Sequence, residues 1–331
     1  MVNYKKIIYA LIVCITSITI YSKNHLTFEP WKHGRLGDQI WNICKSLMLA
    51  DKYSLPFIMK PFNESEHFPI HRTIDNAQSE NNIVRISHET DIETNLEKDV
   101  LFLSHFYTKP KTVLYNYCLE NKEFQKKLTA LFTPNIITNI NLPNNKITVG
   151  MHIRKGSNTD TATSSLQEYY VHENEISYTV DSKEIPVASA AQQTSSNAMD
   201  KRYPIKFPPN QYYIEALKKF SELVHHQPLY VHVFTDSKNP EELLEQLKTV
   251  NLSNVEWHIR NNKEKHNNTL ISDFAQMTKF NCLIRPDSSF SKVIQLIGNY
   301  TTIIYPIHGT WYDNKLLIDT VGIIWHKQPP F

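Results

Sequence analysis

The stretch TVGMHIRKGS, residues 148–157, decides how the rest of the sequence is interpreted, because it joins an apolar strand to a group of cationic side chains. Apolar residues alternate with others along it, so His152 and Arg154 share one face near the strand's end. Lys155 follows, and a glycine then lets the chain turn. Two interpretations stay open: a strand end with a structural ion pair, or a site for a phosphorylated ligand.

Strands and helices alternate after this stretch, which predicts an α/β fold with right-handed βαβ units and a parallel sheet. Strands are expected at 147–154, 229–236, 255–260, 281–286 and 301–307, and helices at 210–224, 239–250, 272–280 and 288–298. Asn239 and Ser272 are the expected N-caps, Pro240 follows Asn239 at a first helical position, and Gly298 closes the last helix.

The first half alternates less regularly. An amphipathic helix opens at the segment Gly34-Arg35-Leu36-Gly37, strands are expected at 55–60 and 99–106, and a helix is expected at 123–132. The Asn-rich segment 135–146 is the candidate domain link. We therefore expect domains at 24–140 and 141–331, the second interrupted by a polar loop, 158–207, that either covers the site or is disordered without function.

Composition sets limits on function. The chain has 331 residues, 41% of them apolar, which is enough to bury a real core. A formal charge of +2 without a long basic run argues against bulk nucleic-acid binding. Three of the four cysteines lie after residue 23, and they permit one disulfide at most. No zinc-finger spacing or D-x-D motif is present, so we expect no bound metal.

The N-terminus, residues 1–23, has the pattern of a targeting segment. Lys5 and Lys6 precede an apolar run that is interrupted by a few hydroxyl residues, and no clear cleavage site follows. A cleaved signal peptide and a retained signal anchor stay equally open. Either predicts a secreted or membrane-anchored protein, in the Golgi if the host is eukaryotic.

Three other segments present groups suited to an anion or a nucleotide. Ser288 and Ser289 open a helix, whose N–H groups suit a phosphate, although serine is also a common N-cap. Asp236 ends a strand, where it could accept from a ribose or a base, or form a turn. The Gly-x-x-Gly start at Gly34 is a weak indication of an anion site by itself, because it matches neither the Walker nor the dinucleotide pattern.

Taken together, these segments resemble the α-1,2-fucosyltransferases, glycosyltransferase family 11, and share parts with O- and α-1,6-fucosyltransferases. The resemblance spans residues 34–298 and rests on GRLGDQIWN, HIRKGS, YYIEAL, VHVFTDS, ISDFAQMTKFNCLI and DSSFSKVIQLIG, in that order. The family typically has G-x-L-G-N-Q, H-x-R-R-x-D and S-S-F-S. This chain departs from that pattern at Asp38, Lys155 and Ser157.

The resemblance implies a GT-B-like fold of two Rossmann-type parallel-sheet domains facing across a cleft. It implies GDP-fucose as donor, a glycan hydroxyl as acceptor, inversion at the sugar carbon, and no cofactor or obligatory metal. Arg154, assisted by His152, would neutralise the diphosphate as the catalytic pair. The implied donor-binding residues are Lys155, Asp236, Ser288, Ser289, Gly34, Arg35 and Gly37.

Other functions stay open at this stage. The same fold could use another nucleotide sugar or fucosylate a protein, and Lys155 and Ser157 allow a degenerate member that binds nucleotide or glycan without catalysis. A secreted α/β binding protein would bind no GDP. Candidates for a general base are Asp38, Asp160 and Glu168, which lie near the motifs in sequence.

Overall fold

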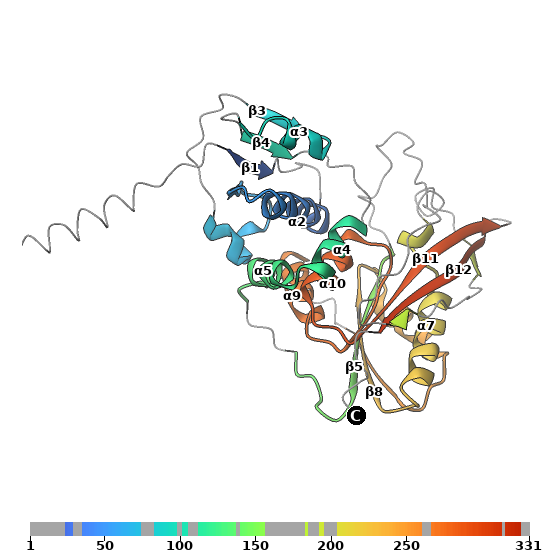
Figure 1. The fold of residues 1–331 in the computed structure, drawn as a ribbon. Coiled ribbons are helices and arrows are strands. Elements are labelled where there is room, and N and C mark those ends of the chain that lie inside the picture. The colour runs from blue at the N-terminus through green and yellow to red at the C-terminus, as the bar shows by residue number, and fades with distance from the viewer. Residues whose placement is uncertain are drawn as a thin grey trace, which may run out of the picture.

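The computed structural model describes residues 24–28, 35–73, 83–97, 101–104, 112–136, 140–155, 183–184, 192–194, 204–259, 266–312 and 315–325 (Figure 1). The expected targeting segment, Gly34, Ser157 and most of the loop 158–207 lie outside these residues. Within the described part of the chain, no helix is both long enough and apolar enough to span a bilayer.

The N-terminal half contains a parallel sheet of four short strands. Its order is β2 (Phe57–Ile58), β1 (His25–Phe28), β4 (Leu101–Ser104) and β3 (Ile83–Ile86). The helical elements of this half are α2 (Leu36–Lys52), η1 (Ser65–His67), η2 (Pro69–Thr73), α3 (Glu89–Glu93), α4 (Thr112–Glu120) and α5 (Lys122–Phe132). Strands β1 and β3 and helices α3 and α4 were not expected from the sequence, whereas α2 and α5 match the expected helices closely.

The second sheet has β5 (Ile147–Ile153) at its centre. Its order is β6 (Lys183–Glu184), β12 (Lys315–Trp325), β11 (Thr302–Tyr312), β10 (Cys282–Ile284), β5, β8 (Leu229–Thr235) and β9 (Val255–Ile259), with β7 (Gln192–Thr194) also paired to β12. The strands from β11 to β9 are parallel, while β12, β6 and β7 run antiparallel to their neighbours. Two mainly parallel sheets confirm the expected α/β fold, and the domain boundaries stay a prediction.

The strand order reverses at β5. From β5 the chain proceeds through α7 (Asn210–Leu223), β8, α8 (Pro240–Lys248) and β9 on one side. Helix α9 (His266–Met277) then carries it across to β10 on the other side of β5, and α10 (Ser289–Ile297) leads on to β11. In an open parallel sheet the crevice outside the strand ends at such a reversal is where ligands bind. The fold therefore predicts a ligand site at the carboxyl ends of β5 and β10.

One hydrophobic core joins the two halves. Buried residues of α2 and α5 form a single cluster with buried residues of α9 and α10. Figure 1 shows these four helices between the two sheets, with α7 on the opposite face of the second sheet. Residues of α7 and α8 belong to a separate cluster on that face. Helix α10 is thus held from both sides, which fixes the position of its N-terminus.

Several local expectations need correction. Helix α9 begins at His266, so Ser272 is not its N-cap but lies within it, where its Oγ accepts from Gln276 Nε2 at 2.9 Å. The antiparallel strand β12 was missed. Strand β11, which pairs with it, continues to Tyr312, beyond the expected end at residue 307. Asn239 and Gly298 do occupy the cap positions of α8 and α10, although the Asn239 side chain makes no capping bond. Cys44, Cys118 and Cys282 are buried free thiols, so none of them forms the disulfide that the sequence permits.

The first turns of α2 and α10 touch at Gly37. A Cβ built on Gly37 would lie 2.4 Å from the backbone N and 2.5 Å from the Cα of Phe290. Backbone atoms cannot move aside as a flexible side chain can, so only glycine allows the helices to approach this closely. Two helix N-termini, separated by about 250 residues of sequence, therefore lie together.

We predict that Gly37→Ala destabilises the protein although alanine is the better helix former. The propensity gain is about 1 kcal/mol, whereas overpacking against backbone costs typically 1–3 kcal/mol and more where nothing can yield, so the free energy of unfolding should fall. Gly150→Ala is the control, because the three atoms nearest to its Cβ would all belong to the Phe280 side chain, the first at 3.3 Å, and not to backbone. Urea unfolding compares the two. Equal stability losses would contradict the close helix contact.

Candidate functional site

The cationic end of β5 faces the start of α10. Arg154, directly after β5, is 9% exposed and donates from Nη1 to the Oγ of Ser288 at 3.3 Å. Its guanidinium carbon lies 5.3 Å from the centre of the Phe207 ring. The contact joins the ends of β5 and β10 across the strand reversal. Arg154 and Ser288, both candidates from the sequence, are therefore brought together.

Ser288 is the N-cap of α10 by position, but its hydroxyl does not cap the helix. The side chain is 1% exposed, and its Oγ accepts from Arg154. Helix N-termini leave their first N–H groups without intrahelical acceptors, and Ser289 is the first residue of this helix. Because the Ser288 hydroxyl does not cap it, the α10 start offers N–H donors beside a guanidinium. That combination suits an anion.

His152 lies on β5 beside the same turn. Its ring centroid is 5.6 Å from that of Phe290, and its Nδ1 is buried with no hydrogen-bond partner among the described residues. Burial, together with the charge of Arg285, lowers the pKa of His152 to about 4, against the opposing effect of Asp236. The imidazole is therefore neutral at pH 7 and can donate from one nitrogen and accept at the other.

Asp236 and Lys155 bind each other and a neighbouring helix. The backbone N–H of Lys155 donates to Asp236 Oδ1 at 2.6 Å, so the carboxylate fixes the chain leaving β5 to the end of β8. The Lys155 ammonium donates to Oδ1 of Asn210, the first residue of α7. These contacts give both side chains structural partners. Donor binding by either one stays a prediction.

The Gly-x-x-Gly segment reaches the site through Gly37, whose backbone packs against Ser289 and Phe290. Arg35 is the exposed N-cap residue of α2, while Gly34 lies outside the described residues. Asp38 is in the first turn of α2, and within the described residues its carboxylate has no ion pair or hydrogen-bond donor. Asp160 and Glu168, the other base candidates, lie outside the described residues.

Arg285, which directly follows β10 and is 3% exposed, was not among the candidates from the sequence. It donates from Nε to Gln295 Oε1 at 2.6 Å and from Nη1 to the carbonyl of Pro286 at 3.1 Å. Lys292 is also buried and pairs with Asp287. The available signal was an arginine at the end of an expected strand, the same position that singled out Arg154, followed here by an expected helix start.

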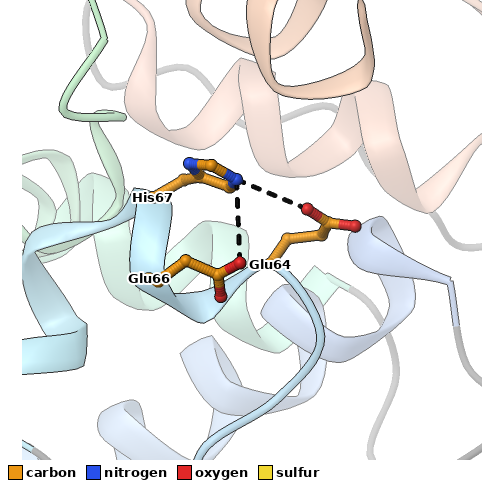
Figure 2. A group of neighbouring side chains, drawn as sticks. All are labelled: Glu64, Glu66 and His67. Carbon is orange, nitrogen blue, oxygen red and sulfur yellow. Dashed lines mark ion pairs between the residues drawn. The ribbon is translucent and has the colours of Figure 1, made fainter. Parts of the chain in front are cut away.

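The groups best placed to hold a metal lie elsewhere. Figure 2 shows Glu64, Glu66 and His67, all from the segment of η1, with the carboxylates directed at His67 Nε2 over 3.5 and 3.8 Å. It is the one such group in the part of the chain that the structure describes, and all three side chains are partly exposed. The ion pairs account for this arrangement, and metal-independence of the site stays a prediction.

Comparisons with known proteins give similarity in structure alone. No model of a protein family matches the sequence, and no curated protein does. The chain is similar to a mutant of Arabidopsis thaliana FUT1 in complex with GDP, at 11% identity, TM-score 0.47, and coverage of 92% of this chain and 75% of that one. It is also similar to POFUT1 in complex with GDP, at 11% identity and a TM-score of 0.42, with coverage of 84% of this chain and 96% of that one. A third similar structure is the fucosyltransferase NodZ from Bradyrhizobium, at 11% identity and a TM-score of 0.41, with coverage of 89% of this chain and 99% of that one.

The lowered pKa of His152 predicts a pH dependence of stability. Between pH 6.5 and about 4 the unfolded chain binds a proton at this residue that the folded chain does not. The free energy of unfolding should therefore fall as the pH is lowered through this interval. His152→Gln should show a smaller fall, measured by urea unfolding at each pH.

If His152→Gln instead has the same slope as the wild type, His152 is not buried in neutral form.

Proposed function

We propose that this protein is a glycosyltransferase that transfers fucose from GDP-fucose to a glycan hydroxyl, in an inverting, metal-independent reaction of the α-1,2 type. The observation that carries the proposal is the contact between Arg154 Nη1 and Ser288 Oγ at the carboxyl ends of β5 and β10. It unites a buried guanidinium, an uncapped helix N-terminus and the strand reversal of a parallel sheet.

A nucleotide diphosphate matches this set of groups. A guanidinium can bind two phosphate oxygens at once, and the first N–H groups of α10 add donors along the helix dipole. In the proposed transfer the oxygen of an acceptor hydroxyl attacks the sugar carbon and loses its proton to a base or to water. The bond to the diphosphate oxygen breaks with its electron pair leaving on GDP. Charge therefore builds up on the diphosphate, and fixed donors there stabilise the transition state most.

The identities of guanine and fucose come from the motif resemblance, as do the α-1,2 linkage and the glycan acceptor. The neutral His152 supports the donor site, because a buried imidazole with an unpartnered Nδ1 can bond to a ligand without adding charge. Export or membrane association is proposed from residues 1–23 alone. A different nucleotide sugar or a protein acceptor would leave the diphosphate chemistry unchanged.

A non-catalytic nucleotide- or glycan-binding protein is the second candidate. It is favoured by Lys155, which replaces an arginine of the family pattern and whose ammonium is bonded to Asn210. Lysine keeps the charge but cannot bind two phosphate oxygens in one plane. Ser157 replaces an aspartate at the same motif.

We predict that Arg154→Ala lowers kcat by a factor of about 10² to 10³, because fixed charge at the departing group is lost. Ser288→Ala should cost about tenfold, because Arg154 keeps its charge but loses one anchoring bond. Transfer and donor hydrolysis by the purified protein, with GDP-fucose and a set of other sugar nucleotides, measure both. Lys126→Ala, a solvent-exposed site on α5, controls for charge removal and should keep wild-type rates.

Absence of turnover with every donor, together with absence of a GDP-dependent thermal shift, would overturn the proposal.

The double variant Lys155→Arg, Ser157→Asp separates the two candidate functions. If the wild type is the proposed transferase, it turns over GDP-fucose before any change, and the variant alters its rate only modestly. If the wild type binds GDP without turnover and the double variant transfers fucose, the non-catalytic function is correct. Single-turnover assays with labelled donor distinguish these results.

A further inference from the structure

Arg285 is a buried guanidinium that contacts only neutral groups among the described residues. Its partners are the Gln295 amide oxygen and the Pro286 carbonyl, and its guanidinium carbon lies 4.9 Å from the centre of the Tyr305 ring. Burying a charge without a carboxylate is costly unless its N–H groups are satisfied and the charge serves the fold or a site. This position therefore needs a specific explanation.

The hydrogen bonds of Arg285 span the turn that carries Ser288. Arg285 directly follows β10, Pro286 comes next in the turn, and Gln295 lies in the last turn of α10. The guanidinium therefore ties the strand end, the turn and the helix together. Because both of its bonds come from one rigid plane, they fix the direction in which α10 leaves the sheet.

Other contacts hold the backbone of the same turn. The N–H of Ser288 donates to the Pro286 carbonyl at 2.9 Å, and the N–H of Asp287 donates to the Ile205 carbonyl at 2.8 Å. The Arg285 carbonyl accepts from the hydroxyl of Tyr212 at 3.0 Å. Lys292, in the middle of α10, pairs with Asp287, whereas the Arg285 side chain joins the turn to the last turn of the helix at Gln295. Loss of the Arg285 side chain would therefore let that end of α10 shift relative to Arg154.

We propose that Arg285 is a positioning residue for the transfer reaction proposed above: through Gln295 it holds the β10–α10 turn so that Ser288 and the first N–H groups of α10 face Arg154. The inference rests on the proposed function. A misplacement of about 1 Å at a reacting group can lower the rate a hundredfold. The hydrogen bond that holds this turn should therefore have a measurable effect on the rate. With two N–H groups engaged and 3% exposure, Arg285 is placed to hold the turn rather than to contact the donor.

The test removes the hydrogen bond between Arg285 and Gln295 and keeps the arginine. Gln295→Met has nearly the same shape but no acceptor for Nε, and it should lower kcat between about tenfold and a hundredfold while KM for the donor changes less. Gln295→Glu restores an acceptor and should keep kcat within about threefold of the wild type. Gln125→Met is the matched control, because Gln125 also contacts α10, at the Leu296 carbonyl, but not the turn.

All variants are assayed as full-length protein below their unfolding temperatures, so that a loss of stability is separated from a loss of rate. Arg285→Lys adds a second measurement if it folds: it keeps the charge but loses the two-bond plane, and it should resemble Gln295→Met. Wild-type kcat in Gln295→Met, or an equal loss of rate in Gln295→Met and Gln295→Glu, would overturn the positioning role alone. An inactive wild type with no GDP binding would overturn the proposed function instead.

Discussion

The arrangement of the site depends on one topological constraint, the reversal of strand order at β5. Because the chain returns from β9 to place β10 on the other side of β5, two strand ends that are more than 130 residues apart become neighbours. Arg154 and Ser288 meet as a consequence. A parallel sheet without that reversal would leave the guanidinium and the uncapped helix start on strands that are not neighbours, and neither alone would amount to an anion site.

The shared core gives this meeting point its rigidity. Helix α10 packs against α2 and α5 of the first half while its own strand belongs to the second sheet, so the halves cannot separate without exposing a continuous apolar cluster. The close contact at Gly37 aligns a second helix start with the first. Buried cations at the turn, Arg154, Arg285 and Lys292, are costly in an apolar interior, and the packing holds their partners in place. Stability and site geometry therefore come from the same interface.

Local sequence patterns predicted much of this structure, and non-local pairing explains what they missed. Apolar alternation located β5 and β8, and cap residues located α8 and α10 to within a residue or two. Strand order is a long-range property, so it could not be obtained from local pattern. The hairpin of β11 and β12 is a local pairing, and it was missed because strands were expected only in alternation with helices, whereas β12 follows β11 directly.

The candidate site divides in the same way. Residue type and position at strand ends predicted Arg154, His152 and Ser288, but serine is equally suited to capping a helix or to binding a ligand, and only the tertiary contact distinguishes the two roles. Lys155 was expected at the donor and is bonded to Asn210, a partner 55 residues away that no local pattern reveals.

The most direct test of the proposed site is a crystal structure of the protein with GDP. We expect diphosphate oxygens within hydrogen-bond distance of Arg154 and of the first N–H groups of α10. GDP bound elsewhere, or bound here with its phosphates in solvent, would contradict it.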